Sequence, residues 1–201
     1  MPVTTGFSRP HIAKYSNEGQ TVTYSDPVEL ARGVEFSIEV ETPDDNNFYA
    51  NNVVAETEPA QMTSGTVTLT VDGLSGEEEA LILGITSSPV SYNEEQVEVI
   101  KYGSTMNPPY LALGGIKRTQ LNGSVSYRPI VLTKVRFSIP PEAAVTQEDQ
   151  IDWQTQELTA TIMRDDTLDK TWKIIPKTGF PTEEEAVNFM LFLMGKTQAA
   201  G

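Results

Sequence analysis

Hydrophobic and polar residues alternate along most of this chain, which predicts β-strands more often than helices. In the stretch from Gly65 to Gly84, Val67, Leu69 and Val71 fall on one face of an extended chain, and threonines fall on the other. This period of two is typical of a strand with one buried face. The same stretch then changes to a helical period, so a strand is expected to lead directly into a short helix.

Two short helices are predicted from their end signals. Ser75 occupies an N-cap position with Glu78 three residues later, and Gly84 follows the last apolar residue of the segment. Such a capping pair starts a helix, and a glycine commonly ends one. Thr182 and Glu185 repeat the spacing before an apolar run near the C-terminus, which predicts a second helix there.

The remaining periodic segments are predicted to be strands of an antiparallel sheet. Asn122-Gly123, which tolerates the positive φ angles of a tight turn, is the strongest hairpin signal in the chain. The predicted strands are residues 20–24, 34–41, 51–61, 66–71, 96–102, 110–119, 124–139, 151–164 and 171–175. We therefore expect a mainly β fold with two small helices and several long loops.

The chain is interpreted as one domain of 201 residues, because it contains no repeat and no linker long enough to separate two domains. Residues 1–19 lack periodicity and are predicted to form an N-terminal arm. Residues 20–195 form the β core with a long polar loop at 43–52, and residues 196–201 form a tail.

Composition narrows the classes of function. The 28 acidic residues outnumber the 14 basic ones, so the formal net charge is −14, and such a surface repels nucleic acid. The chain has no cysteine, which excludes disulfides and thiol catalysis and suits a protein folded in a reducing cytosol. No segment has the roughly 18 apolar residues that a membrane-spanning helix needs.

Candidate catalytic chemistry is sparse. The one histidine, His11, lies in the predicted arm without a nearby carboxylate, so it makes a poor base or metal ligand. Asp165 and Asp166 form a carboxylate pair that a glycosidase could use if another carboxylate faced it across a cleft, although such residues more often end a strand. We predict no enzymatic activity, no metal site and no cofactor.

Basic residues gather in one region, which raises the possibility of subunit pairing. A solvated hairpin explains such a cluster equally well, but subunits that pair basic with acidic faces would need this segregation. The residues of the predicted basic patch are Lys117, Arg118, Arg128, Lys134 and Arg136.

Four segments together resemble the major tail proteins of siphophages, the subunits that polymerise into the tail tube. They cover most of residues 34–173, in the order and spacing of that family. The segments are NNFYANNVVAETEP, GTVTLTVDGLSGEEEALILG, NPPYLALGGIKRTQLNGSVSYRPIVLTKVRFSIPPE, and DQIDWQTQELTATIMRDD followed by TWK. Residues before 20 and after Gly195 show no clear match.

The resemblance implies an antiparallel β-sandwich or partly closed barrel of the phage tail-tube type. It further implies homohexameric rings that stack into a conduit for DNA ejection, with a tape measure protein in the lumen and with tail terminator and distal tail or baseplate proteins at the ends. Viral DNA would pass without specific binding. The protein would assemble in the bacterial cytoplasm and reside in the virion tail, without a membrane partner.

The resemblance also assigns surfaces. Glu35, Glu39 and Glu41 lie on the polar face of one predicted strand and are expected to face the lumen, the alternative being outside solvent. The 43–52 loop is expected to pack on an adjacent subunit or ring, with the N-terminal arm and the 140–150 loop as further contacts. The residues of the 43–52 loop that are expected to make this contact are Asp44, Asp45, Phe48 and Tyr49.

Three other classes of function stay open. The chain could be the tube protein of a contractile tail, a gene transfer agent or a type VI secretion system. It could instead be a monomeric capsid decoration or baseplate module. A glycosidase that uses Asp165 and Asp166 is the third possibility, and the least favoured.

Overall fold

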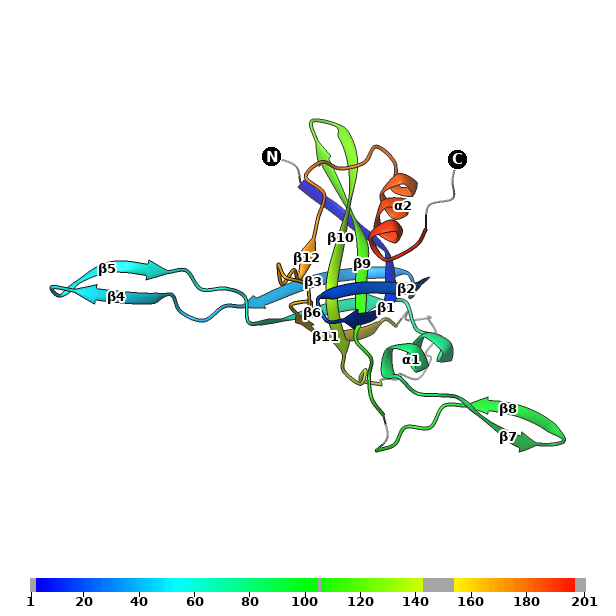
Figure 1. Cartoon of the computed structure of the whole chain (residues 1–201). Coiled ribbons are helices and arrows are strands. Elements are labelled where there is room, and N and C mark those ends of the chain that lie inside the picture. Colours follow the sequence, from blue (N-terminus) through cyan, green and yellow to red (C-terminus); the bar gives the residue numbers. More distant parts are fainter. Residues whose placement is uncertain (1–2, 105, 143–153, 198–201) are drawn as a thin grey trace.

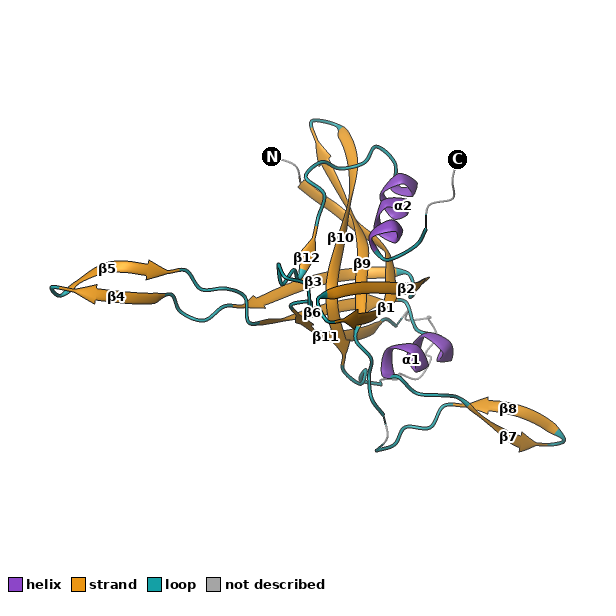
Figure 2. Cartoon of the chain, in the orientation of Figure 1, coloured by secondary structure: helices purple, strands orange, loops and turns teal. Residues whose placement is uncertain are grey.

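The structure is a computed structural model that describes residues 3–104, 106–142 and 154–197, and it is mainly β, as the sequence predicts. Eight strands form one antiparallel sheet in the order β2-β1-β9-β10-β11-β6-β3, with β12 paired to β10 (Figures 1 and 2). The strands of this sheet are β1 Val3–Glu18, β2 Thr21–Glu29, β3 Gly33–Glu41, β6 Ser64–Val71, β9 Leu111–Leu121, β10 Ser124–Phe137, β11 Gln156–Met163 and β12 Lys173–Ile174.

Two separate hairpins and two helices complete the fold. The hairpins are β4 Asn46–Ala50 with β5 Val53–Glu58, and β7 Ser88–Tyr92 with β8 Glu95–Val99. Both hairpins extend far from the central sheet in Figure 1. The helices are α1 Gly76–Leu83 and α2 Glu183–Leu193.

The main sheet curls around one apolar core. Ile12 of β1 and Leu69 of β6 belong to the same buried cluster, although β9, β10 and β11 lie between their strands in the sheet. Phe7 of β1 stacks on Phe36 of edge strand β3, with ring centroids 4.9 Å apart. The sheet nevertheless stays open, because β2 and β3 end it and do not pair with each other.

Helix α2 covers part of the opposite face of the sheet and forms a second core. Met190 and Met194 are fully buried in a cluster with Ile116 of β9 and Val131 of β10. Gly114 permits this approach, because a Cβ there would lie 2.7 Å from the Met190 sulfur. The helix therefore packs directly on the backbone of β9.

Both predicted helices are confirmed, including their N-caps. The backbone N–H of Ser75 donates to the Glu78 carboxylate at 2.7 Å, and Gly84 ends α1 with a φ of 64°. The Thr182 hydroxyl accepts a hydrogen bond from the backbone N–H of Glu185 at the start of α2. The strand alternation around Val67 is also confirmed, because β6 alternates buried and less buried positions.

The predicted N-terminal arm is wrong, because residues 3–18 form a strand that is paired on both sides. β1 pairs antiparallel with β2 on one side and with β9 on the other. Its ladder with β9 shifts register between Thr4 and Gly6 and again between Ser8 and His11, and Arg9 has a φ of 54°. Such bulges interrupt the period of two, which explains why the sequence shows no strand pattern there.

His11 consequently lies in a folded strand and not in an irregular arm, with 6% of its surface exposed. Its Nδ1 is 2.9 Å from the carbonyl oxygen of Arg9, so the neutral ring donates to that oxygen. Burial is the largest effect on His11 and lowers its pKa below the ordinary 6.5. The fold therefore favours the neutral ring.

We expect this histidine to weaken the fold in mild acid. Because its folded-state pKa is depressed, the unfolded chain binds more protons as the pH falls below 6.5, and stability decreases in that window. Urea denaturation at several pH values between 8 and 5 should show a steeper loss of unfolding free energy for the wild type than for His11→Gln. If the unfolding free energies of the wild type and His11→Gln fell in parallel with pH, His11 would not be the group responsible.

Candidate assembly surfaces

The predicted 43–52 loop is in fact the first strand and turn of the β4–β5 hairpin. Asn51 and Asn52 occupy the turn with φ of 51° and 65°, values that asparagine tolerates better than most residues. Asp44 and Asp45 at its base are both exposed, and Asp45 accepts a hydrogen bond from the backbone N–H of Ala60 at 2.7 Å. The sequence located this segment but missed its pairing, because no alternation of buried and exposed positions marks the first strand.

The far part of the hairpin exposes large apolar side chains. Phe48 and Tyr49 are each 63% exposed, and Val53 and Val54 beside the turn are also exposed. Neither strand contributes to the two buried clusters. Because an isolated two-stranded hairpin is marginally stable in water, this one gains stability when another surface covers it.

A second projecting hairpin, β7–β8, was not predicted. Only a strand at residues 96–102 was expected, and the structure gives β8 at Glu95–Val99 with β7 as its partner. Asn93 and Glu94 form the turn, with φ of 48° and 65°. A glutamate is unusual at the position where a hairpin turn prefers glycine, so the turn signal in the sequence was weak.

The outer face of β3, β6 and β11 presents polar side chains, and neither α1 nor α2 covers it. Glu35 of β3 lies opposite Thr70 of β6, which lies opposite Glu157 of β11, and Glu39 lies opposite Thr66 in the same way. Glu35, Glu39 and Glu41 are all exposed, so the predicted polar face of β3 is confirmed.

The apolar face of β3 is only partly as predicted. Phe36 and Ile38 pack against the core, but Val34 and Val40 are 56% and 40% exposed. They lie toward the two ends of an edge strand, where the curled sheet provides no neighbour to cover them.

Charge is strongly segregated along the chain and therefore in space. Residues 33–100 contain 14 of the 28 acidic residues and none of the 14 lysines and arginines. The rest of the chain thus carries equal numbers of acidic and basic residues. The acidic segment includes β3, α1 and both projecting hairpins, so neither hairpin contains a basic residue.

The predicted basic patch separates into three parts. Lys117 of β9 and Arg128 of β10 lie opposite each other in the ladder, so their side chains share one face, while the neighbouring Arg118 lies on the other. Lys134 and Arg136 are engaged elsewhere. Lys134 pairs with Asp166 at 2.7 Å, and Arg136 donates to the Pro108 carbonyl oxygen at 2.9 Å. Five residues close in sequence therefore do not make one surface.

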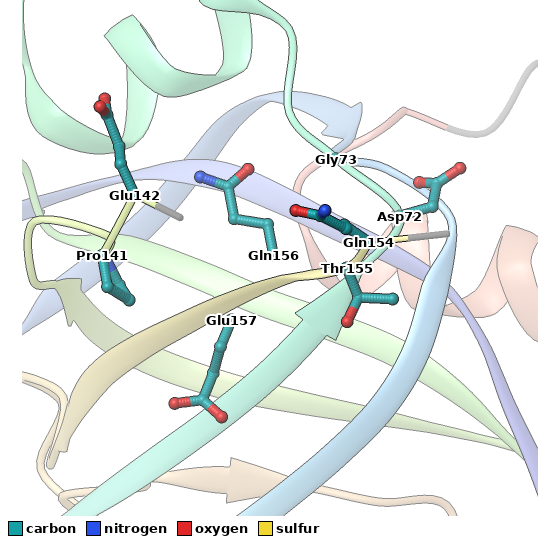
Figure 3. Close-up of a pocket in the computed structure, with 8 residues that line it drawn as sticks. All are labelled: Asp72, Gly73, Pro141, Glu142, Gln154, Thr155, Gln156 and Glu157. Atoms are coloured by element: carbon teal, nitrogen blue, oxygen red, sulfur yellow. The ribbon is translucent and has the colours of Figure 1, made fainter. Parts of the chain in front are cut away.

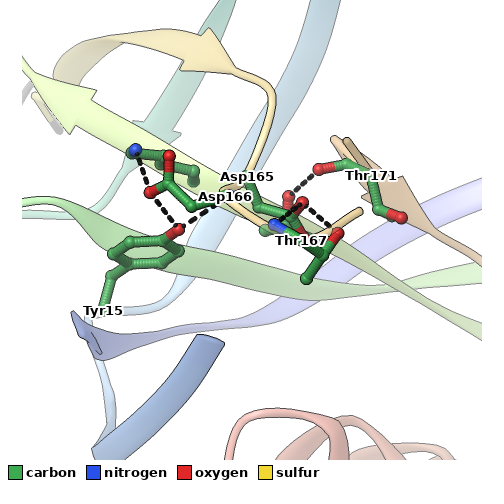
Figure 4. A network of polar contacts seen from close by, with 7 residues as sticks. Tyr15, Asp165, Asp166, Thr167 and Thr171 are labelled. Carbon is green, nitrogen blue, oxygen red and sulfur yellow. Dashed lines mark hydrogen bonds and ion pairs between the residues drawn. The ribbon is translucent and has the colours of Figure 1, made fainter. Parts of the chain in front are cut away.

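Asp166 belongs to a network that connects three parts of the fold (Figure 4). Its carboxylate accepts hydrogen bonds from Lys134 of β10 and from the Tyr15 hydroxyl of β1, both at 2.7 Å. The bonds from Lys134 and Tyr15 hold the pKa of Asp166 below its ordinary value. A glycosidase acid needs a raised pKa, so this environment favours a structural role for Asp166.

Asp165 is also occupied by structural bonds. It is 4% exposed, and its Oδ1 accepts hydrogen bonds from the backbone N–H and the hydroxyl of Thr167 at 3.2 and 2.6 Å. Its own backbone N–H donates to the Thr171 carbonyl oxygen at 2.9 Å. The two aspartates thus stabilise the turn after β11. This agrees with the interpretation that such a pair ends a strand.

A hollow of about 790 Å³ lies beside β11 and the end of β6 (Figure 3). Its lining is polar and acidic, and comprises Asp72, Gly73, Pro141, Glu142, Gln154, Thr155, Gln156 and Glu157. It borders the point where the described chain stops at 142 and resumes at 154, so most of the predicted 140–150 contact loop lies outside the described residues. We assign no ligand to this hollow.

Within residues 3–104, 106–142 and 154–197, no group of three or more His, Cys, Asp or Glu side chains is arranged to hold a metal ion. No described helix combines the length and apolar character needed to cross a bilayer. The predicted tail at 196–201 is described only for Lys196 and Thr197, which are exposed.

In comparisons with known proteins, no family model and no curated protein matches this chain.

Proposed function

We propose that this protein is a structural subunit that polymerises as stacked hexameric rings into the tail tube of a long-tailed, non-contractile phage. The β4–β5 hairpin is the observation that carries the proposal. It holds four exposed apolar side chains away from both cores of its own subunit. Exposed apolar surface of this kind marks a contact with another molecule, and a further copy of the same chain is the partner that a tube requires.

The open sheet supports repeated association. β2 and β3 end the main sheet, and an unpaired strand edge invites a strand from another chain. Where the surface that binds and the surface that is bound lie on different parts of a subunit, association continues around a ring or along a filament. The hairpin and the sheet edges are such different parts.

The polar face of β3, β6 and β11 is the proposed lumen surface. It presents glutamates and threonines, including Glu35, Glu39 and Glu157, and the segment that contains β3 and β6 has no lysine or arginine. Phosphate groups bind proteins chiefly through positive charge, so an anionic wall would let DNA pass without holding it. The six-fold symmetry and the terminal partners rest on the family resemblance.

Negative-stain electron microscopy of the purified, concentrated protein at neutral pH tests the proposal. We expect hollow tubes or rings, because each copy offers both a projecting hairpin and open sheet edges. Light scattering on the same sample measures the size of the particles in solution. Monomers at every concentration, also after addition of a tail-tip initiator complex, would favour a capsid decoration or baseplate module instead.

A further inference from the structure

A cluster of three cations lies where β9, β10 and β12 meet, and no carboxylate of the described chain pairs with it. We define the cationic cluster as Lys117, Arg128 and Lys173. Lys117 and Arg128 are direct cross-strand neighbours, an arrangement that is unfavourable for like charges. The four ion pairs in the described part of the chain all involve other residues.

Aromatic rings and one carbonyl group hold the cluster in place. The Lys117 Nζ lies 5.9 Å from the centre of the Phe36 ring, and the Lys173 Nζ lies 4.4 Å from that of Trp172. Arg128 donates from Nη2 to the Pro176 carbonyl oxygen at 2.9 Å, while its buried Nε has no hydrogen-bond partner among the described residues. Burial is the main reason that the pKa of Lys117 is lowered, with Lys173 and Arg128 adding to it.

The tip of the β7–β8 hairpin has the opposite chemistry. We define the acidic tip as Glu94 and Glu95, both exposed, with Tyr92 paired to Glu95 and 67% exposed. The tip of the β4–β5 hairpin differs, because its turn and flanking residues are uncharged from Phe48 to Ala55. Of the two projecting hairpins, only β7–β8 therefore concentrates carboxylates at its end.

We propose that the acidic tip of one subunit docks on the cationic cluster of a second copy of this chain. The charges are complementary, and in Figure 1 the β7–β8 hairpin and β12 lie on opposite sides of the molecule, so the two surfaces cannot meet within one subunit. The contact joins two different surfaces and so leaves one of each free for the next subunit. This proposed contact rests on the proposed function, because it is one of the interfaces between subunits of the proposed tube.

Cross-linking between two separately purified variants tests this contact, because the chain has no cysteine of its own. Glu95→Cys and Lys117→Cys are mixed in equal amounts and treated with a short bismaleimide. We expect a covalent heterodimer that decreases when salt is raised, because salt screens exposed charges. The matched control replaces Lys117→Cys by Lys170→Cys, at an exposed lysine in the loop after β11, and should give only background.

Charge exchange gives an independent readout. Glu94→Lys/Glu95→Lys and Lys117→Glu/Arg128→Glu should each fail to assemble alone, since like charges then face each other. Mixing the two variants should restore assembly, because alternating copies again present opposite charges. Glu56→Lys/Glu58→Lys on the other hairpin is the control and should not rescue the cluster variant. Circular dichroism and thermal melts establish that each variant is folded.

The outcomes separate this contact from the proposed function. Wild-type tubes without a heterodimer would overturn the contact and leave the tube proposal standing. Wild-type monomers without a heterodimer would overturn both. Loss of assembly in the cluster variant that no tip variant rescues would mean that the cluster binds another anionic partner, which also overturns this contact.

Discussion

Replacing the aromatic residues of the β4–β5 hairpin is expected to abolish assembly while leaving the subunit folded. In Phe48→Ser/Tyr49→Ser, two side chains that are each 63% exposed in the free subunit are removed. Aromatic residues at the centre of an interface typically contribute on the order of 2–4 kcal/mol each. The concentration needed for assembly should therefore rise by roughly 30- to 700-fold for the loss of one such residue.

The free energy of unfolding should change little, because neither strand of the hairpin contributes to the two buried clusters. Substitutions of exposed residues away from special features usually change stability by less than about 0.5 kcal/mol. Thermal denaturation and circular dichroism check the fold, and sedimentation velocity over a range of concentrations measures assembly. A variant that assembles at the wild-type concentration would show that the hairpin is not an interface.

A control variant separates a specific contact from general surface hydrophobicity. Phe192→Ser/Leu168→Ser removes two exposed apolar side chains, 50% and 76% exposed, at α2 and in the loop after β11. We expect this variant to assemble like the wild type. Equal loss of assembly in both double variants would mean that the apolar surface as a whole, and not the hairpin, is responsible.

The sequence predicted best the elements whose periodicity reflects burial. β6 alternates cleanly because β3 and β11 flank it and one of its faces packs on the core, so Val67, Leu69 and Val71 are fully buried. Helix α1 was predicted from its capping residues, and these form the expected hydrogen bond. In both cases local sequence and tertiary environment favour the same structure, which is the condition for reading structure from sequence.

Elements that do not bury a regular face were predicted poorly. The first four residues of β4 are exposed, so no alternation marks it and it was predicted to be a loop, and β7 was missed for the same reason. β5 is also exposed throughout, but it lies within the strand predicted at residues 51–61. β1 was missed because bulges shift its register against β9. The pairing of each element depends on neighbours distant in sequence, which a local pattern does not contain.

The basic residues illustrate the same limit at the candidate interface. Lys117 and Arg118 are adjacent in sequence, but successive side chains of a strand point to opposite faces. Lys173, more than fifty residues away from Lys117, joins it only because β12 pairs with β10. Sequence clustering therefore identified the region, and only the sheet topology identified which cations act together.

The second large effect is expected at Phe7 of β1, the strand that was predicted from the sequence to be an arm. Its ring occupies a slot between two glycines, because a Cβ at Gly33 or Gly115 would lie 2.5 or 2.4 Å from it. It also stacks on Phe36 of β3, so it fills the gap where the curled sheet approaches itself. Phe7→Ala should cost about 3 kcal/mol, which lowers the Tm by roughly 6–12 °C in a chain of this size.

Val3→Ala tests the same strand at a position where little should change, because Val3 is 63% exposed. An arm that orders only on assembly would give a different result, since Phe7→Ala would then impair tube formation and leave the Tm of the free subunit unchanged. Removal of residues 1–19 extends the comparison. It deletes the buried Ile12 and Ala13 and leaves β9 without a partner on one side, so the shortened chain should not fold, whereas loss of a true arm would leave a folded monomer.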